Sequence, residues 1–207
     1  MALPSRIDVS TVSIGRIDDL HIKGRTHRSA IRKQPVRDSV LQVTRLGIVG
    51  DEHADPGHHG GPEKAIYVYP FVHYAAWEKD YGLFDHDDVF GTGELGVPFF
   101  GENLTIGGNI DETMAHIGDR LAWGDEVILK ITRPREPCFK FDRVMGKGAS
   151  TRMKTNGRCG WYCSVERPGE VLVDAPLVFL GHDPGTPDLR PTVRDDFFRR
   201  VRKNRSL

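Results

Sequence analysis

The chain has 207 residues, enough for one large domain, and its 29 Lys plus Arg balance 29 Asp plus Glu to a net charge of zero. The neutral charge and the lack of a basic tail argue against nucleic-acid binding, and no apolar run approaches the roughly 20 residues of a membrane helix. The first residues show no signal-peptide pattern, and three cysteines without a disulfide spacing are typical of a reducing compartment. We therefore expect a cytoplasmic protein that binds neither nucleic acid nor membrane.

Short strand-like segments dominate the sequence. β-branched and aromatic runs that end near Gly or Pro predict strands at residues 9–17, 40–49, 64–70, 102–106, 125–134, 160–166, 169–175 and 177–181. In segment 40–49 the apolar face is expected to hold Val40, Val43, Leu46 and Val49, with a bulge. The sequence ERPGE at 166–170 predicts a hairpin turn between two of these strands.

Two segments change to a helical period. Residues 71–81 carry apolar side chains near helical spacing, and Gly82 is expected to end that helix. Near the end of the chain, Thr192 is placed to cap a helix over 193–203, whose Val193, Phe197 and Val201 repeat at i, i+4 and i+8. Many short strands with so few helices are typical of a β-barrel or β-sandwich, and no linker divides the body of the chain.

The string GTGELG at residues 91–96 matches the spacing of a dinucleotide-binding loop. Such a loop needs a strand before it and a helix after it, whereas Pro98 and Gly101 follow here and oppose a helix. We expect an ordinary flexible loop and no nicotinamide or flavin site.

The three cysteines differ in their surroundings. Cys159 and Cys163 lie on one face of a predicted strand, about 13 Å apart, which excludes a mutual disulfide and favours two small core residues. Cys138 follows a strand that Pro134 is expected to end, between basic residues such as Arg133 and Arg135. Nearby cations favour the thiolate form, so Cys138 is either a reactive or metal-binding thiol or a loop cysteine beside solvated arginines.

The stretch GDEHADPGHHGGPEKAIYVYP at 50–70 concentrates polar groups before an apolar strand. If extended, it places Asp51, His53 and Asp55 on one face, with His58 and His59 in the glycine-flanked turn that follows. Histidine and carboxylate ligands suit zinc, so a zinc hydrolase is one alternative, although no ordered histidine spacing supports it. A solvated turn is the other.

Five fragments, in this order, resemble the MOSC-domain proteins, the family named for the C-terminal domain of molybdenum-cofactor sulfurase. They are LGIVGDEHAD, HHGGPEKAIYVYP, FGENLTI, IGDRLAWGDEVILKITRPREPCFKF and GRCGWYCSV. The resemblance extends from about Lys33 to Asp174 and is strongest to the YiiM-like bacterial branch. It implies a mainly β fold, a pyruvate-kinase-like β-barrel over residues 1–185 with short peripheral helices. A short helical tail over 186–207 would replace the three-helix tail common in that branch.

The resemblance also implies a function. Relatives bind a molybdenum cofactor, a molybdopterin, and reduce N-hydroxylated compounds, with the cysteine at the position of Cys138 as the metal ligand. By the same resemblance the stretch 50–70 lines the cofactor and substrate pocket, where His59 is the expected proton donor. His53 stands where relatives more often have a long amide side chain, so its role is left open. The expected cofactor-binding residues are Lys33, Asp51, Lys64, Asn103, Arg133, Arg135 and Arg158.

The partners follow from what the sequence lacks. It has neither an iron–sulfur cysteine set nor a flavin fingerprint, so electrons are expected from a separate flavin or iron–sulfur reductase. The substrate would be a small N-hydroxylated compound such as a purine, and a homodimer is left open. The alternative function is a sulfur or molybdenum-cofactor carrier, in which Cys138 holds a persulfide or the cofactor for transfer.

Overall fold

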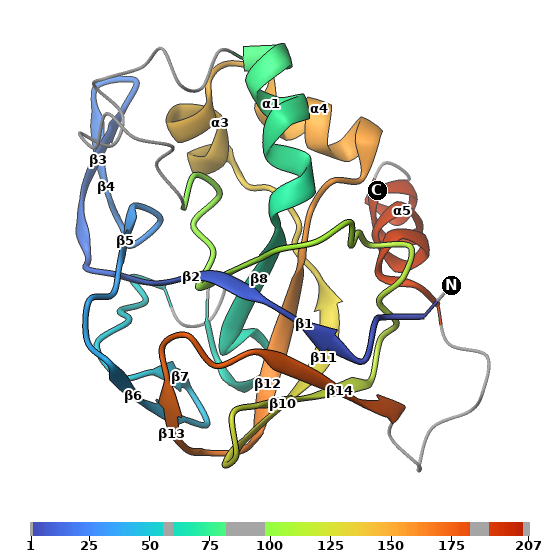
Figure 1. Ribbon diagram of the computed structural model, residues 1–207. Helices are drawn as coiled ribbons and strands as arrows, with labels where there is room; N and C mark the ends of the chain where they lie inside the picture. The colour runs from blue at the N-terminus through green and yellow to red at the C-terminus, as the bar shows by residue number, and fades with distance from the viewer. Residues whose placement is uncertain (1, 56–59, 82–97, 183–190, 205–207) are drawn as a thin grey trace.

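The structure is a computed structural model that describes residues 2–55, 60–81, 98–182 and 191–204 (Figure 1). His58, His59 and the loop 91–96 lie outside these residues, so the expectations for them stay predictions. The described chain is mainly β, as the sequence predicts, and it has four α-helices where the sequence predicts two.

The strands are β1 (Arg6–Ile7), β2 (Val9–Gly15), β3 (Asp18–Ile22), β4 (Arg25–Ser29), β5 (Lys33–Pro35), β6 (Val40–Thr44), β7 (Gly47–Ile48), β8 (Ile66–Pro70), β9 (Leu104–Ile106), β10 (Asp119–Trp123), β11 (Val127–Pro134), β12 (Trp161–Arg167), β13 (Gly169–Leu172) and β14 (Leu177–His182). The helices are α1 (Tyr74–Tyr81), α3 (Phe139–Met145), α4 (Ala149–Asn156) and α5 (Val193–Lys203), with 3₁₀ turns η1 (Pro62–Lys64) and η2 (Phe71–His73). In Figure 1, α1, α3 and α4 gather at one end of the sheet, and α5 lies beside them. Among the described helices, none is both long and apolar enough to cross a membrane.

One mixed sheet of nine strands forms the body, in the order β1-β14-β10-β11-β12-β8-β9-β2-β5. Its β8–β9 pair is parallel, and the other pairs are antiparallel. Only Asp8 separates β1 from β2, yet β1 pairs with β14 and β2 pairs with β9, so the sheet curls back toward itself. No closed barrel is found in the described residues, and the expected barrel is therefore corrected to a large curved sheet.

A smaller sheet, in the order β13-β6-β7, corrects two expectations. Segment 40–49 is a hairpin rather than one bulged strand, and its buried residues are Leu41, Val43 and Ile48. Three of the four residues predicted for its apolar face are exposed, namely Val40, Leu46 and Val49. The chain does turn after β12, but β13 pairs with β6 and not with β12, so the predicted hairpin is wrong.

Several elements have weak local signals and were not expected. β10 is short and carries an aspartate and an arginine, although its alternate residues Asp119, Leu121 and Trp123 are buried against the sheet. The β3–β4 hairpin is polar and forms a two-stranded sheet of its own. The helices α3 and α4 follow Cys138 and have only 7 and 8 residues, too few to display a clear helical period.

The helix α5 confirms the prediction for 193–203. The Thr192 hydroxyl accepts a hydrogen bond from the backbone N–H of Asp195 at 3.1 Å and so caps the first turn. Val193, Phe197 and Val201 are buried in the same hydrophobic core as the sheet. The predicted helix near 71–81 is also confirmed, as η2 followed by α1.

Candidate functional site

A pocket of about 720 Å³, including its open mouth, lies beside the Cys138 loop. Its walls are formed by the end of β4 and the start of β5, by the segment that follows β7, by the turn η1 and the strand β8, and by the segment that precedes β9. The loop between β11 and α3, the start of α3, and β12 complete them. Five of the residues predicted for the site line it, namely Lys33, Lys64, Asn103, Arg135 and Cys138. These come from four separate parts of the chain, and only the tertiary structure brings them together.

Cys138 lies in the loop between β11 and α3, which begins after Pro134 ends β11 as predicted. Its side chain is partly exposed and lines the pocket. The loop is held by the Cys138 carbonyl, which accepts hydrogen bonds from the Phe141 N–H at 3.0 Å and the Ser150 hydroxyl at 3.1 Å. Cys138 is therefore an accessible thiol on a backbone anchored from two sides.

Cys159 and Cys163 are completely buried in the core, as predicted. Burial raises the pKa of both thiols, because a thiolate is poorly solvated there. One detail differs from expectation: the strand begins at Trp161, because Gly160 adopts a φ of 62° and interrupts the extended chain. A side chain at Gly160 would also collide with the Val68 carbonyl, so the position requires glycine.

Arg135 is a buried cation in the pocket wall, only 4% exposed. Its guanidinium lies 4.2 Å from the ring centroid of Phe141 and 5.8 Å from that of Tyr67, and it hydrogen-bonds the Met153 sulfur at 3.2 Å. No carboxylate of the described residues pairs with it. A buried charge normally needs a counter-charge, so Arg135 leaves the pocket complementary to an anionic ligand.

A polar network lies behind the pocket and centres on the fully buried carboxylate of Asp51. It accepts hydrogen bonds from the Gly15 N–H at 2.7 Å, from the Asn103 amide at 2.9 Å and from the Lys33 ammonium. Asn103 in turn accepts from the Tyr67 N–H at 3.0 Å, which fixes β8 against this network. Burial lowers the pKa of Lys33, and the Asp51 charge partly opposes that shift.

His53, whose role the sequence leaves open, also lines the pocket. Its Nε2 lies 3.7 Å from Asp51 Oδ2, and burial lowers its pKa. Gly60 packs on its ring so closely that an added Cβ would lie 3.0 Å from the ring carbon Cγ. The structure thus holds an imidazole at the pocket between a carboxylate and a glycine backbone.

The remaining predicted residues are placed differently. Arg133 does not line the pocket, but its guanidinium donates at 3.3 Å to Glu136, which does. Arg158 does not line it either, and its carbonyl accepts from the Tyr69 hydroxyl at 3.1 Å. Burial, and then the charge of Arg133, lower the pKa of Lys64.

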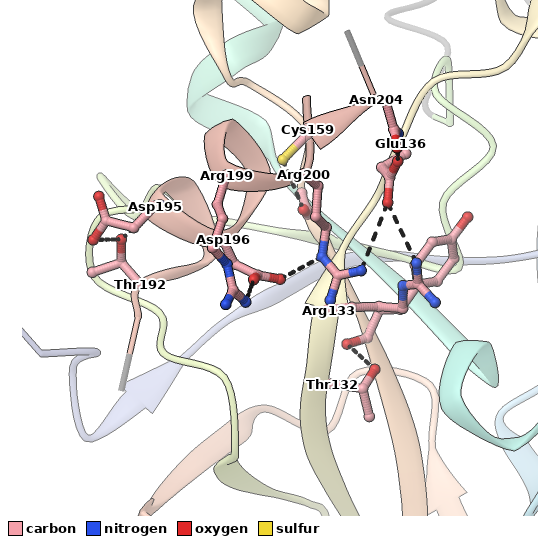
Figure 2. A network of polar contacts seen from close by, with 12 residues as sticks. Thr132, Arg133, Glu136, Cys159, Thr192, Asp195, Asp196, Arg199, Arg200 and Asn204 are labelled. Atoms are coloured by element: carbon pink, nitrogen blue, oxygen red, sulfur yellow. Dashed lines mark hydrogen bonds and ion pairs between the residues drawn. The ribbon is translucent and has the colours of Figure 1, made fainter. Parts of the chain in front are cut away.

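Glu136 joins the pocket wall to the C-terminal helix. Figure 2 shows Arg133, Arg200 and Asn204 converging on this carboxylate, with Arg200 at 3.9 Å and the Asn204 amide at 3.2 Å. Arg200 also donates to Asp196 at 2.6 Å within α5. The sequence did not predict Glu136, Tyr67 and Tyr162 as pocket residues. An acidic residue beside arginines shows no sequence pattern that indicates a pocket, and neither does a tyrosine within a strand.

The described residues contain no group of three or more His, Cys, Asp or Glu side chains arranged to hold a metal ion. A zinc site that uses His58 or His59 falls outside those residues. Within the described part of the chain, the pocket therefore offers one soft ligand, Cys138, together with cations and hydrogen-bond donors.

Comparisons with known proteins identify the family of this chain. The chain is 37% identical over 150 residues to YiiM of Escherichia coli, which covers 72% of this chain and 62% of that protein. It is 36% identical over 144 residues to a Gibberella moniliformis protein named "Reductase", covering 69% of this chain and 24% of the relative. The crystal structure of Escherichia coli YiiM matches with a TM-score of 0.67 and 28% identity over 94% of this chain and 76% of the other. The MOSC domain family matches residues 55–178, which include Lys64, Asn103 and Cys138, and the chain belongs to this family as a close relative of YiiM.

Proposed function

We propose that this chain is a molybdenum-cofactor-dependent reductase of N-hydroxylated compounds. The observation that carries the proposal is that one pocket holds an accessible thiol, Cys138, and a buried cation, Arg135, that no carboxylate of the described residues compensates. The MOSC family and the relative named "Reductase" support an oxidoreductase of this class. The matched region spans 62% of Escherichia coli YiiM and 24% of the fungal relative, so substrate and partner are proposals for this chain.

The pocket fits the proposed cofactor by the chemistry of its donors. Molybdenum accepts soft thiolate ligands, and Cys138 is the only one of the three cysteines that lines the pocket. A molybdopterin carries a phosphate, and the guanidinium of Arg135, which pairs with no carboxylate in the described part of the chain, offers a charge-assisted bidentate donor for an anion. Lys64 adds a second cation and Asn103 an amide at the same pocket.

The bound cofactor would supply the two-electron reduction, while the protein binds, orients and protonates. The aromatic walls formed by Tyr67, Phe100 and Tyr162 restrict water and offer flat surfaces for a heteroaromatic substrate. Release of water from an N–OH group consumes protons, for which the resemblance implies His59 as the donor. His53 is the described histidine in the pocket, and Asp51 next to its Nε2 can hold the protonated ring in place.

The electrons would come from a separate reductase. We base this on the sequence, which has no flavin fingerprint and no iron–sulfur cysteine set. The fungal relative matches over only 24% of its length, so the remainder of that protein has room for other domains.

The test uses protein made in a molybdenum-competent host, analysed for bound molybdenum and pterin. Loaded protein should reduce an N-hydroxylated purine with reduced viologen and not with NADH alone, and a flavin or iron–sulfur reductase should restore NADH-dependent turnover. Cys138→Ala should lose molybdenum and activity while keeping its unfolding temperature. Turnover with NADH alone in a flavin-free preparation would reveal a missed cofactor site. Loaded protein that no donor can turn over would favour the carrier function.

A further inference from the structure

A surface next to the pocket carries an excess of positive charge, although the whole chain is neutral. The surface consists of the β3–β4 hairpin with its following residues (18–32) and α3 with its following residues (139–147), which we call the basic rim. It carries seven cations, Lys23, Arg25, Arg28, Arg32, Lys140, Arg143 and Lys147, against three acids, Asp18, Asp19 and Asp142. Asp142 is engaged by the Ser150 N–H at 2.6 Å. None of the seven cations forms an ion pair with a carboxylate of the described residues.

The two parts of the basic rim are joined and border the pocket. Lys140 donates to the Arg28 carbonyl at 2.9 Å, and Arg143 donates to the His21 carbonyl at 2.9 Å, so α3 holds the hairpin. Ser29 from the hairpin and Lys140 from α3 both line the pocket, and Cys138 immediately precedes α3. Figure 1 shows the β3–β4 hairpin and α3 at the same end of the molecule. A protein bound to the rim would therefore lie close to the Cys138 thiol.

An aromatic pair lies within this charged surface. Phe139 is 55% exposed, and its ring meets the ring of His27 edge to face at a centroid distance of 5.2 Å. Exposed aromatic and arginine side chains are enriched at protein–protein interfaces, where a buried aromatic residue often contributes much of the binding energy. The rim thus combines a hydrophobic anchor with a ring of cations.

We propose that the basic rim is the docking surface for an acidic electron-donor protein. This inference rests on the proposed reductase function, because electrons supplied from outside must enter near the pocket. A surface of like-signed charge beside the mouth speeds association with a partner of opposite charge and rejects a basic one. Docking on Phe139 would bring the redox centre of such a partner to the rim of the Cys138 pocket. For each N–O bond broken, the donor gives two electrons, two protons are taken up, and the products are the N–H compound and one water molecule.

The experiment compares two electron sources for the molybdenum-loaded protein: an acidic flavodoxin kept reduced by its own reductase, and reduced viologen. The variant Arg25→Glu/Lys147→Glu reverses two exposed rim charges that do not hold the hairpin to α3, and Phe139→Ala removes the anchor. The matched control, Arg37→Glu/Arg45→Glu, reverses two exposed charges outside the rim. We expect flavodoxin-driven turnover at low donor concentration to fall about tenfold or more in the rim variants at low salt. The control should keep wild-type rates, and viologen-driven turnover should be unchanged in all of them.

Binding is measured separately by titrating the flavodoxin into molybdenum-free protein at two salt concentrations. Salt-sensitive binding that the rim variants lose supports docking even if turnover fails, so the two proposals can fail independently. Equal losses in rim and control variants would overturn the proposal, because they would indicate a general charge effect. A rim variant that keeps flavodoxin binding but needs more substrate with viologen would also overturn it, and would make the rim a guide for anionic substrates.

Discussion

The buried pair of Asp51 and Lys33 offers the sharpest test of the pocket's architecture. Lys33 is 6% exposed, and the Asp51 carboxylate is its counter-charge within the described residues. Asp51→Asn preserves the size of the side chain and removes the charge, which leaves an ammonium group buried without compensation. Breaking a buried ion pair in this way costs about 3–5 kcal/mol. For a domain of this size each kcal/mol lowers the melting temperature by about 2–4 °C, so we expect a decrease of about 6–20 °C.

The assay is urea unfolding of wild type, Asp51→Asn and the double variant Lys33→Met/Asp51→Asn. The double variant should recover much of the loss, because replacing both partners removes the unpaired charge. Asp8→Asn is the control, since this carboxylate is 81% exposed and its loss should change the free energy of unfolding by less than about 0.5 kcal/mol.

The pH dependence gives a second readout with a definite sign. Burial lowers the pKa of Lys33, and removing Asp51 takes away the larger of the two charges that oppose this shift, the other being that of Glu102. Between the lowered folded pKa and the ordinary value of 10.5, the unfolded chain binds a proton that the folded chain does not, so stability increases with pH in that window. The window should be wider in Asp51→Asn than in wild type. A loss below about 1 kcal/mol without this pH dependence would refute the view that the pair holds the pocket wall.

Three further predictions concern single side chains. A thiol reagent should modify Cys138 in the folded protein but reach Cys159 only on unfolding, and rapid reaction of a second thiol would contradict the burial of Cys159. Cys159→Ala should lower the free energy of unfolding by about 1 kcal/mol. Because burial lowers the pKa of His53, the free energy of unfolding should fall as pH decreases below 6.5. The urea midpoint should therefore be lower at about pH 5 than at about pH 7, and His53→Gln should reduce this difference. Phe197→Ala should cost about 3–5 kcal/mol in one cooperative transition, since its ring is fully buried in the common core; a separate early transition of α5 would disagree.

Local pattern alone predicted the elements whose neighbours in sequence share their environment. The fully apolar run of β8, the alternation of β11 and β12 and the i, i+4, i+8 spacing of α5 each reflect burial that is repeated along one segment. The core position of Cys163 followed from the same alternation. These features depend on periods of 2 and 3.6 residues, which any short window of sequence displays.

Strand pairing depends on long-range contacts, so the tertiary structure decided it. The residues of segment 40–49 are apolar at both kinds of position, and only pairing with β13 and β7 selects Leu41 and Val43 for burial and leaves Val40 exposed. In the same way, the turn after β12 was visible in the sequence, whereas the choice of β6 as the partner of β13 was not.

The sequence also determined the chemical types available at the site, above all a thiol flanked by arginines. It did not determine which arginine enters the pocket, because Arg133 and Arg135 look alike on either side of Pro134. The structure directs Arg135 inward onto Phe141 and leaves Arg133 with Glu136 at the side of α5. Burial and charge compensation are set by residues far away along the chain, so the environment of each charge was decided only when the fold brought those residues together.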